Sequence, residues 1–311
     1  MRLLKIASAA LLTAVVSGTV FHHTLRVQTY TFLQPIDALS VGVDMDQMHL
    51  SVSALVGSRW TEWETLHIEK EFDPLLRESN LVLFPQPASK VRIRGSTAEY
   101  VVHPIRISRA PIRYAVAARG SMGIPRILSR RQWGADESLT YAGRRTSRSD
   151  EPTGQIDNGD YDKVPQRVKD CEAAQRNNPE EFRTEHTVTK DPSGKQYRWQ
   201  RRYSPAIRQL VVHHTAQKVS GDKRAPAERV RALYEYHANN RGWGDIGYHY
   251  VIDEEGQIYE GRAGGDSVVG GHVYCSNVGS IGVVMMGNFE IEKPTYAQTS
   301  SLKWLLAELA N

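Results

Sequence analysis

The sequence of 311 residues is poor in several features that would place it at once in a specialised class. It has only two cysteines, Cys171 and Cys275, so it cannot be a small scaffold held by several disulfides. These two could pair in an oxidising compartment, or Cys275 could ligate a metal, and the sequence gives no geometry to decide. The net charge is only +4, which says little about partners. The 40% hydrophobic and 24% charged residues are ordinary for a globular protein, and the length suffices for two domains.

No clear A-x-A cleavage site follows the apolar run at the N-terminus, from Ile6 to Phe21, and this run is short for a membrane span. Arg2 and Lys5 precede it, and a charged start before a short apolar stretch is typical of a signal peptide. We therefore predict a signal peptide or N-terminal anchor over residues 1–24 and a secreted or cell-envelope location. Membrane anchoring through this segment stays open, and a buried first helix is the alternative.

Residues 25–116 contain evenly spaced strand-like runs such as HLSVSALV and KVRIRG, separated by Gly, Pro and acidic clusters. This pattern indicates an all-β, sandwich-like accessory domain. Trp60 and Trp63, in SRWTEW, could stack on sugar rings, although packing within the sandwich is the commoner role for such residues. Residues 117–126 contain Gly and Pro, which predicts a linker.

A polar insertion occupies residues 137–203 and contains few apolar side chains. Such a segment can bury little surface, which predicts an extended or partly disordered loop with one helix in KVPQRVKDCEAAQR. Several arginines in it could bind carboxylates or phosphates, with solvated loop charges as the alternative reading: Arg144, Arg145, Arg148, Arg198, Arg201 and Arg202.

The remainder of residues 127–311 follows an α/β pattern. The run Leu210–Val212 predicts a buried strand, and a helix begins near Pro226 with one apolar face. The sequence DEEG at 253–256 predicts a hairpin, and residues 280–286 predict a second buried strand. A last helix begins at Thr295, where Gln298 has the capping-box spacing. We predict a mixed central β-sheet flanked by helices.

A series of short motifs occurs in order along this region. HHT at 213–215 is followed by GWGDIGYH at 242–249, YEGR at 259–262, GGH at 270–272, SIG at 280–282 and GNF at 287–289. The series resembles the peptidoglycan recognition protein and type 2 N-acetylmuramoyl-L-alanine amidase family. The match covers roughly the last 110 residues, plus ILSRRQWGAD at 127–136. An unrelated α/β protein would require the whole series to be coincidence.

The resemblance implies a Zn²⁺ cofactor with His213 as the first metal ligand and Tyr248 as the catalytic residue. A zinc site with three protein ligands acidifies its bound water and polarises the amide carbonyl. A phenol beside it can donate to the developing oxyanion. The alternatives are a core histidine bonded to backbone and a packed strand tyrosine.

The family's other two zinc ligands, a histidine and a cysteine or aspartate, come after its last helix. This sequence stops at Asn311, within that helix, so we expect a fragment that lacks them. His214 and His249 point away from His213 and Tyr248, because neighbouring strand residues face opposite sides of a sheet. His272 follows two glycines at the wall of the family's groove. None of the three is a convincing replacement ligand.

The resemblance also implies a partner, peptidoglycan, and a reaction, hydrolysis of the amide between N-acetylmuramic acid and L-alanine; no nucleic acid is expected. Arg262 stands where family members that select meso-diaminopimelate carry arginine, which matches the extra carboxylate of that residue. Gly242 and Trp243 match a Gly-Trp pair in the same members. The other predicted substrate-binding residues are His214, Thr215, His237, Arg241, His272 and Asn277. A non-catalytic peptidoglycan recognition module is the alternative function.

Overall fold

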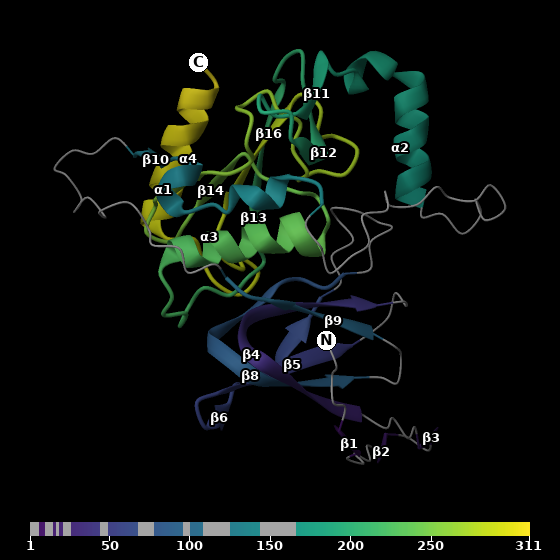
Figure 1. Cartoon of the computed structure of the whole chain (residues 1–311), viewed down its shortest axis with the longest axis vertical. Coiled ribbons are helices and arrows are strands. Elements are labelled where there is room, and N and C mark those ends of the chain that lie inside the picture. The colour runs from purple at the N-terminus through teal and green to yellow at the C-terminus, as the bar shows by residue number, and fades with distance from the viewer. Residues whose placement is uncertain are drawn as a thin grey trace. The chain divides into compact units, whose positions relative to one another are not determined.

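The computed structural model describes residues 6–9, 15–16, 19–20, 26–43, 49–67, 78–95, 100–107, 125–143 and 166–311. They fall into two compact units (Figure 1). The first contains the strands up to Ile107 and residues 221–224, and the second contains the helices and the other strands. Most of the predicted signal segment 1–24, most of the predicted linker 117–126, and Arg144, Arg145 and Arg148 lie outside the described residues. Among the described residues, no helix is both long and apolar enough to cross a membrane.

The first unit is built of strands, as predicted. Its main sheet is antiparallel in the order β1-β4-β8-β5-β6, with β7 on β5 and β9 on β4. The bounds are β1 (Ile6–Ala9), β4 (Arg26–Val43), β5 (Leu50–Val56), β6 (Arg59–Trp60), β7 (Glu64–Leu66), β8 (Val82–Gly95) and β9 (Tyr100–Ile105). The strands β2 (Val15–Val16) and β3 (Thr19–Val20) form a separate pair.

The two longest strands, β4 and β8, change partners along their length. Their pairing shifts register between Thr31 and Ile36, near Pro35, Pro85 and Pro87, which cannot donate ladder hydrogen bonds. Beyond this point β4 also pairs with β9. Within β8, Val91 and Ile93 are buried in the core while Lys90, Arg92 and Arg94 face outward, which is the period-2 alternation of a half-buried strand.

The second unit has the predicted mixed sheet, in the order β10-β15-β14-β16-β13. Parallel pairs join β13 to β16, β14 to β16 and β10 to β15, and β14 pairs antiparallel with β15. The bounds are β10 (Ile127–Leu128), β13 (Gln209–His214), β14 (Tyr250–Ile252), β15 (Ile258–Glu260) and β16 (Ser280–Met285).

Helices cover both faces of this sheet. Val284 of β16 packs in one cluster with Trp133 of α1 (Arg130–Trp133) and Val230 of α3 (Pro226–Glu235). Val283, the preceding residue, packs in a second cluster with Leu305 of α4 (Tyr296–Leu309). The core is therefore two apolar layers on either side of the sheet.

The local signals that predicted these elements have the expected geometry. Thr295 and Gln298 form a reciprocal capping box at the start of α4. In the hairpin between β14 and β15, the Asp253 carboxylate accepts from the backbone N–H groups of Glu255 and Gln257, both at 2.9 Å. The helix α3 continues into a single π turn over Tyr236–Asn240.

The prediction of an extended or partly disordered loop over residues 137–203 was wrong for the described part of that insertion, whereas the helix predicted in KVPQRVKDCEAAQR is confirmed. It forms a 3-10 turn (Glu137–Thr140), the helix α2 (Gln166–Asn177), a second 3-10 turn (Pro179–Phe182) and a hairpin of β11 (His186–Lys190) and β12 (Gln196–Tyr203). Composition failed because the segment is held by contacts to distant residues rather than by a core of its own. Cys171 forms a disulfide with Cys275, Tyr203 bridges to Val268, and within the insertion Tyr197 stacks on the distant Tyr141 with ring centroids 5.5 Å apart.

Candidate functional site

A cluster of imidazole and phenol rings lies at the carboxyl end of β13. The Nε2 atom of His213 shares a 3.1 Å hydrogen bond with Nδ1 of His272. The Tyr248 ring lies 5.4 Å from the His213 ring and 5.5 Å from the His237 ring, measured between centroids. Four residues singled out from the sequence are thus brought together from the end of β13, the π turn, the segment before β14 and the loop before β16.

Glycines in the GGH and SIG motifs make room for this cluster. A Cβ atom on Gly282 would lie 2.4 Å from the His272 ring, and one on Gly270 would lie 2.7 Å from it. Gly282 also donates its backbone N–H to Nδ1 of His249, so the Nε2–H of His249 donates to the Val268 carbonyl. His249 therefore connects β16 to a neighbouring loop and stays neutral in the core.

Burial keeps these histidines uncharged at neutral pH. Loss of solvation, with a smaller contribution from His214, lowers the pKa of His213 to about 4. Loss of solvation and the neighbouring His249 and His213 lower the pKa of His272 as well, and burial does the same to His237. Neutral imidazole can accept a hydrogen bond and can ligate a metal, so the cluster suits uncharged polar ligands and metal ions.

Two predicted binding residues, His214 and Thr215, lie apart from this cluster. The Nδ1 atom of His214 accepts from the backbone N–H of Phe289 at 3.0 Å, and its ring stacks on the Phe289 ring. This agrees with the expectation that His213 and His214 face opposite ways. Thr215 is buried and accepts from the Gly287 N–H, so it fixes the chain after β13 to the chain after β16.

The π turn leads into the Gly-Trp pair. Gly242 has a left-handed backbone with φ of +71°, a region that favours glycine, and its absent side chain would meet no atom within 4 Å. Trp243 packs on the His237 ring at 4.9 Å between centroids. Arg241 is buried and donates through Nε to the Tyr236 hydroxyl. Gly242 and Trp243 thus form a wall on the side of the cluster that contains His237.

Trp199 of the insertion is a site residue that the sequence did not reveal. Its ring meets the Trp243 ring edge-on with centroids 5.9 Å apart. The guanidinium carbon of Arg262 lies 5.2 Å from the Trp199 ring centroid. A tryptophan in a polar insertion gives no signal of its own, because only the folded hairpin β11–β12 brings it to the Gly-Trp pair.

Arg262 is buried, with 3% of its surface exposed. It donates through Nη1 to the Ile246 carbonyl at 3.3 Å, and its Nε has no hydrogen-bond partner within the described part of the chain. Burial lowers the pKa of Arg262, and the nearby Asp245 opposes that shift. A buried cation with an unfilled donor is costly, so this side chain is suited to pair with an anionic group.

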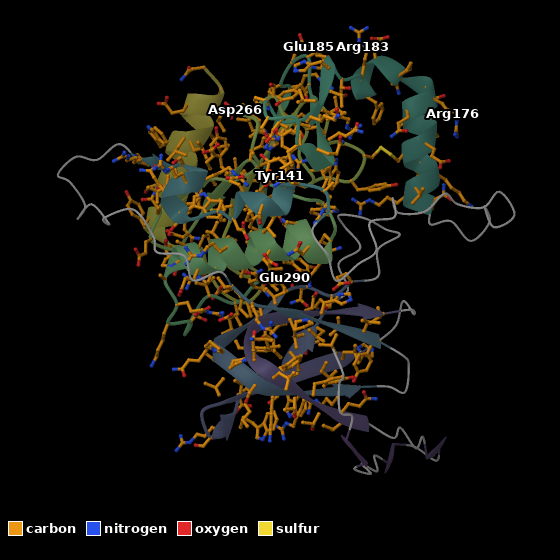
Figure 2. The ribbon with its side chains drawn as sticks, viewed as in Figure 1. Tyr141, Arg176, Arg183, Glu185, Asp266 and Glu290 are labelled. Carbon is orange, nitrogen blue, oxygen red and sulfur yellow. A yellow bond between two sulfur atoms is a disulfide. The ribbon has the colours of Figure 1, made fainter. Side chains whose placement is uncertain are left out.

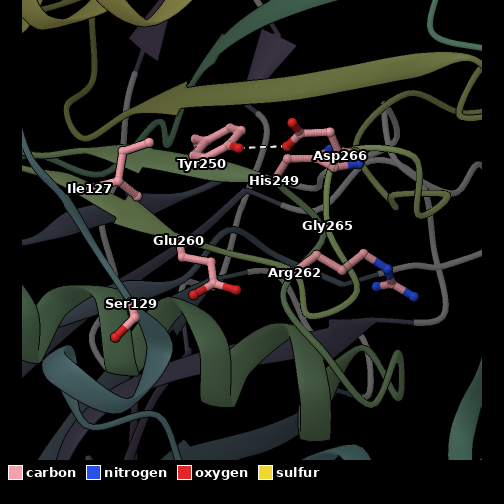
Figure 3. A pocket seen from close by; sticks show the side chains of 8 residues that line it. All are labelled: Ile127, Ser129, His249, Tyr250, Glu260, Arg262, Gly265 and Asp266. Atoms are coloured by element: carbon pink, nitrogen blue, oxygen red, sulfur yellow. Dashed lines mark hydrogen bonds between the residues drawn. The ribbon is translucent and has the colours of Figure 1, made fainter.

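Arg262 also lines a hollow of about 210 Å³ beside β14 and β15 (Figure 3). Glu260 and Asp266 line the same hollow, and the Tyr250 hydroxyl donates to the Asp266 carboxylate. The hollow therefore combines a guanidinium with two carboxylates. Neither carboxylate was singled out from the sequence, because acidic residues at a strand end, such as Glu260, or in a turn, such as Asp266, are usually solvated.

Cys171 and Cys275 form a disulfide, which joins α2 of the insertion to the loop that follows His272 (Figure 2). This closes the question left open by the sequence, because a disulfide sulfur is not available as a thiolate ligand for zinc. In the same loop Asn277 accepts from the backbone N–H groups of His272 and Val273, at 2.8 and 3.0 Å. The loop that presents His272 is thus fixed at both ends.

The described residues do not complete a zinc site. Across residues 125–143 and 166–311, and the described strands before them, no group of three or more His, Cys, Asp or Glu side chains could hold a metal ion. His213 and His272 bond to each other instead. A structural or catalytic zinc needs three or four protein ligands, so these residues alone do not fit the metal.

Part of the second unit is similar to known proteins. Residues 202–311 match the family described as N-acetylmuramoyl-L-alanine amidase. The chain is similar to peptidoglycan-recognition protein SC2 of Drosophila melanogaster, with 38% identity over 98 residues, which is 32% of this chain and 52% of the relative. It is also similar to the N-acetylmuramoyl-L-alanine amidase of Homo sapiens, with 36% identity over 103 residues, which is 32% of this chain and 18% of the relative.

Among solved structures, a complex of the ectodomains of peptidoglycan recognition proteins LCa and LCx with tracheal cytotoxin matches with 33% identity and a TM-score of 0.32. The match covers 34% of this chain and 63% of that chain. Drosophila peptidoglycan recognition protein SD matches with 22% identity and a TM-score of 0.35, over 60% of this chain and 74% of that one. The chain spans about half the length, 52%, of the recognition protein SC2 that it matches.

Proposed function

Residues 202–311 belong to the peptidoglycan recognition protein and type 2 N-acetylmuramoyl-L-alanine amidase family, and on that basis we propose that the protein binds the muropeptide of peptidoglycan at the cluster around His213. The observation that carries the proposal is the contact of half-buried, neutral His213 with Tyr248 and His272. Uncharged imidazole and phenol groups match the amides and hydroxyls of a sugar–peptide junction better than a highly charged ligand. The peptidoglycan wall lies outside the cytoplasmic membrane, so we also propose a secreted or cell-envelope location.

The proposed stem peptide carries meso-diaminopimelate rather than lysine. The two residues differ by one carboxylate, and Arg262 is a buried cation whose Nε is unfilled among the described residues. A carboxylate that reached Arg262 would fill that donor with a charge-assisted hydrogen bond. Lysine has no group that could do so, which would make the discrimination large relative to the size of the chemical difference.

Hydrolysis of the amide between N-acetylmuramic acid and L-alanine is the second candidate function. It is favoured by His213, which has the neutral form required of a metal ligand, and by the phenol of Tyr248 beside it. Zinc, when bound, would activate water and polarise the carbonyl in such a reaction. Because the described residues do not complete its ligand set, binding rather than hydrolysis is the function we derive from them.

Calorimetry with purified muropeptides tests the binding proposal. We expect the wild type to bind the meso-diaminopimelate form more tightly than the lysine form, His213→Ala to weaken both, and Arg262→Ala to weaken the diaminopimelate form selectively. Lys303→Ala, an exposed position on α4, is the matched control and should bind like the wild type. A wild type that binds neither muropeptide would contradict the proposed function. Equal affinity for the two would contradict only the diaminopimelate assignment.

Metal analysis separates binding from hydrolysis. We expect the purified 311-residue chain to contain little zinc and to release no peptide from muropeptides, as measured by mass spectrometry. Stoichiometric zinc together with turnover that disappears in His213→Ala would establish hydrolysis instead. In that case Tyr248→Phe should retain zinc and lose rate, because only the hydroxyl has been removed.

A further inference from the structure

Four side chains on the outer face of the first unit form a continuous stack. The guanidinium carbon of Arg92 lies 3.9 Å from the Trp60 ring centroid and 5.0 Å from the Trp63 ring centroid. The guanidinium carbon of Arg94 lies 4.5 Å from the centroid of the same Trp63 ring. The order is therefore Trp60, Arg92, Trp63, Arg94, and we call these four residues the cation–indole row.

The row is a surface feature and not part of the core. The residues between its arginines, Val91 and Ile93, belong to the buried cluster, whereas Trp60 and Trp63 are half-buried and lie outside it. Lys90 continues the same outward face of β8. Alternate residues of a strand are about 6.6–6.8 Å apart, so three cations follow one line along the sheet.

The positive charge of the row is not neutralised within the described part of the protein. Neither Arg92 nor Arg94 forms an ion pair with any described residue, although Glu62 and Glu64 flank Trp63 in the sequence. Arg92 makes one long hydrogen bond, from Nη2 to the Ser53 hydroxyl at 3.3 Å, and its buried Nε has no partner among the described residues. Loss of solvation also lowers the pKa of Arg92, so water compensates its charge incompletely.

Stacking prepares these arginines for an anion. A guanidinium held flat against an indole keeps its in-plane N–H donors available at the edge, in the fork that matches two oxygens of a phosphate. Holding the side chain in place reduces the conformational entropy lost on binding. The exposed parts of the indoles are apolar surfaces of the size of a sugar ring, beside those donors.

We propose that the cation–indole row, with Lys90, binds a phosphodiester-bearing anionic glycan of the cell wall. Charge complementarity selects a polyanion, because three cations in line repel one another until a ligand with regularly repeated charge neutralises them. The alternation of cation and ring matches the alternation of phosphate and sugar in such a polymer. The choice of a wall polymer over other polyanions rests on the proposed peptidoglycan binding by the second unit.

Sedimentation with purified cell-wall sacculi tests the proposal with the full chain. Hydrofluoric acid removes phosphodiester-linked polymers and leaves peptidoglycan, so walls are compared before and after treatment. We expect the wild type to bind untreated walls more tightly, and the double substitution Arg92→Gln/Arg94→Gln to lose about tenfold in affinity for untreated walls only. Arg106→Gln removes one exposed cation elsewhere in the same unit and should behave like the wild type.

A charge-retaining variant and a competing polyanion serve as further controls. Arg92→Lys/Arg94→Lys retains both charges and should keep part of the affinity, which guards against a loss of folding in the glutamine variant. Equal wild-type binding to treated and untreated walls would overturn the row's assignment, while muropeptide calorimetry reports the second unit independently. Tighter binding of the wild type to a single-stranded DNA oligonucleotide than to the released wall polymer would also overturn it.

Discussion

The ring cluster around His213 and the cation–indole row are both built from aromatic and basic side chains, yet they differ in charge. In the cluster, burial lowers the pKa of His213 to about 4 and the site is neutral. In the row, guanidiniums are too basic to lose their protons, so charge persists at the surface. Side-chain basicity and depth together therefore decide whether aromatic–basic contacts make a neutral site or a cationic one.

The two regions also differ in how they are held. The cluster depends on close packing against glycines and on a loop tied by the disulfide. The arginines of the row lie on β8, and its tryptophans lie in β6 and in the segment between β6 and β7, so the row needs neither. Changes that disturb packing should therefore affect the cluster strongly and the row weakly.

Removal of the disulfide should have the largest effect. The bond joins cysteines separated by 104 residues, and the chain-entropy estimate for such a loop is about 4–5 kcal/mol. Cys171→Ser/Cys275→Ser should lower the free energy of unfolding of the second unit by up to this amount and weaken muropeptide binding. Urea denaturation measures the loss. The control for the row is the difference in affinity between untreated and hydrofluoric-acid-treated walls, which should be the same in the double variant as in the wild type.

A pH dependence should follow from Asp253, a carboxyl buried in the β14–β15 hairpin. Burial raises the pKa of Asp253 from 3.8 to about 6, so the folded state binds the proton more tightly than the unfolded state. The stabilisation is therefore complete below about pH 4 and is lost as pH rises to about 6, by about 3 kcal/mol. Urea denaturation across this range should show the slope in the wild type. A slope of the same size in Asp253→Asn would contradict this attribution.

Gly282→Ala should disturb the cluster directly. The added Cβ would lie 2.4 Å from the His272 ring, and overpacking of this kind costs about 1–3 kcal/mol. Calorimetric melting should show a lower midpoint, and muropeptide binding should weaken. Gly271→Ala is the matched control, because the nearest atom to its added Cβ is 3.6 Å away, an ordinary contact. Equal effects of the two substitutions would show that the cluster is not closely packed.

The smallest effect is expected when Trp63 is replaced by Leu in the row. Cation–π contacts at exposed sites contribute about 0.5–1 kcal/mol, so stability should change by no more than that. Affinity for untreated walls should nevertheless fall, because Arg92 and Arg94 lose the ring that positions them. A destabilisation of several kcal/mol would show instead that Trp63 is a packing residue of the core.

The sequence predicted correctly those elements that are determined by residues close together in the chain. The capping residues Thr295 and Gln298, the turn at Asp253 and the strand containing His213 each have a signal within a few residues, and all three elements form. The prediction that the strand at Leu210–Val212 is buried was wrong, because β13 lies at the edge of the described sheet and Val212 is 42% exposed. The family resemblance rests on such short motifs. It brought His213 and Tyr248 to attention, and the structure places their rings together.

Sequence reasoning failed where the determinant is a contact between distant segments. The order of the insertion depends on Tyr141, Tyr203 and Cys171, each of which meets a residue far away in the chain. The burial of Arg262 beneath Trp199 is of the same kind. Composition and periodicity describe neighbours along the chain, so they do not report which polar segment covers which motif.

The disulfide has a consequence for the order in which the protein matures. At about 5–20 residues per second, synthesis of the 104 residues from Cys171 to Cys275 takes about 5–20 s, during which the first thiol has no partner in its own chain. Within these 311 residues there is no third cysteine, so an early oxidant could join Cys171 only to another molecule. Covalent dimers, visible on a non-reducing gel, are therefore the misassembled product to expect when oxidation outpaces synthesis.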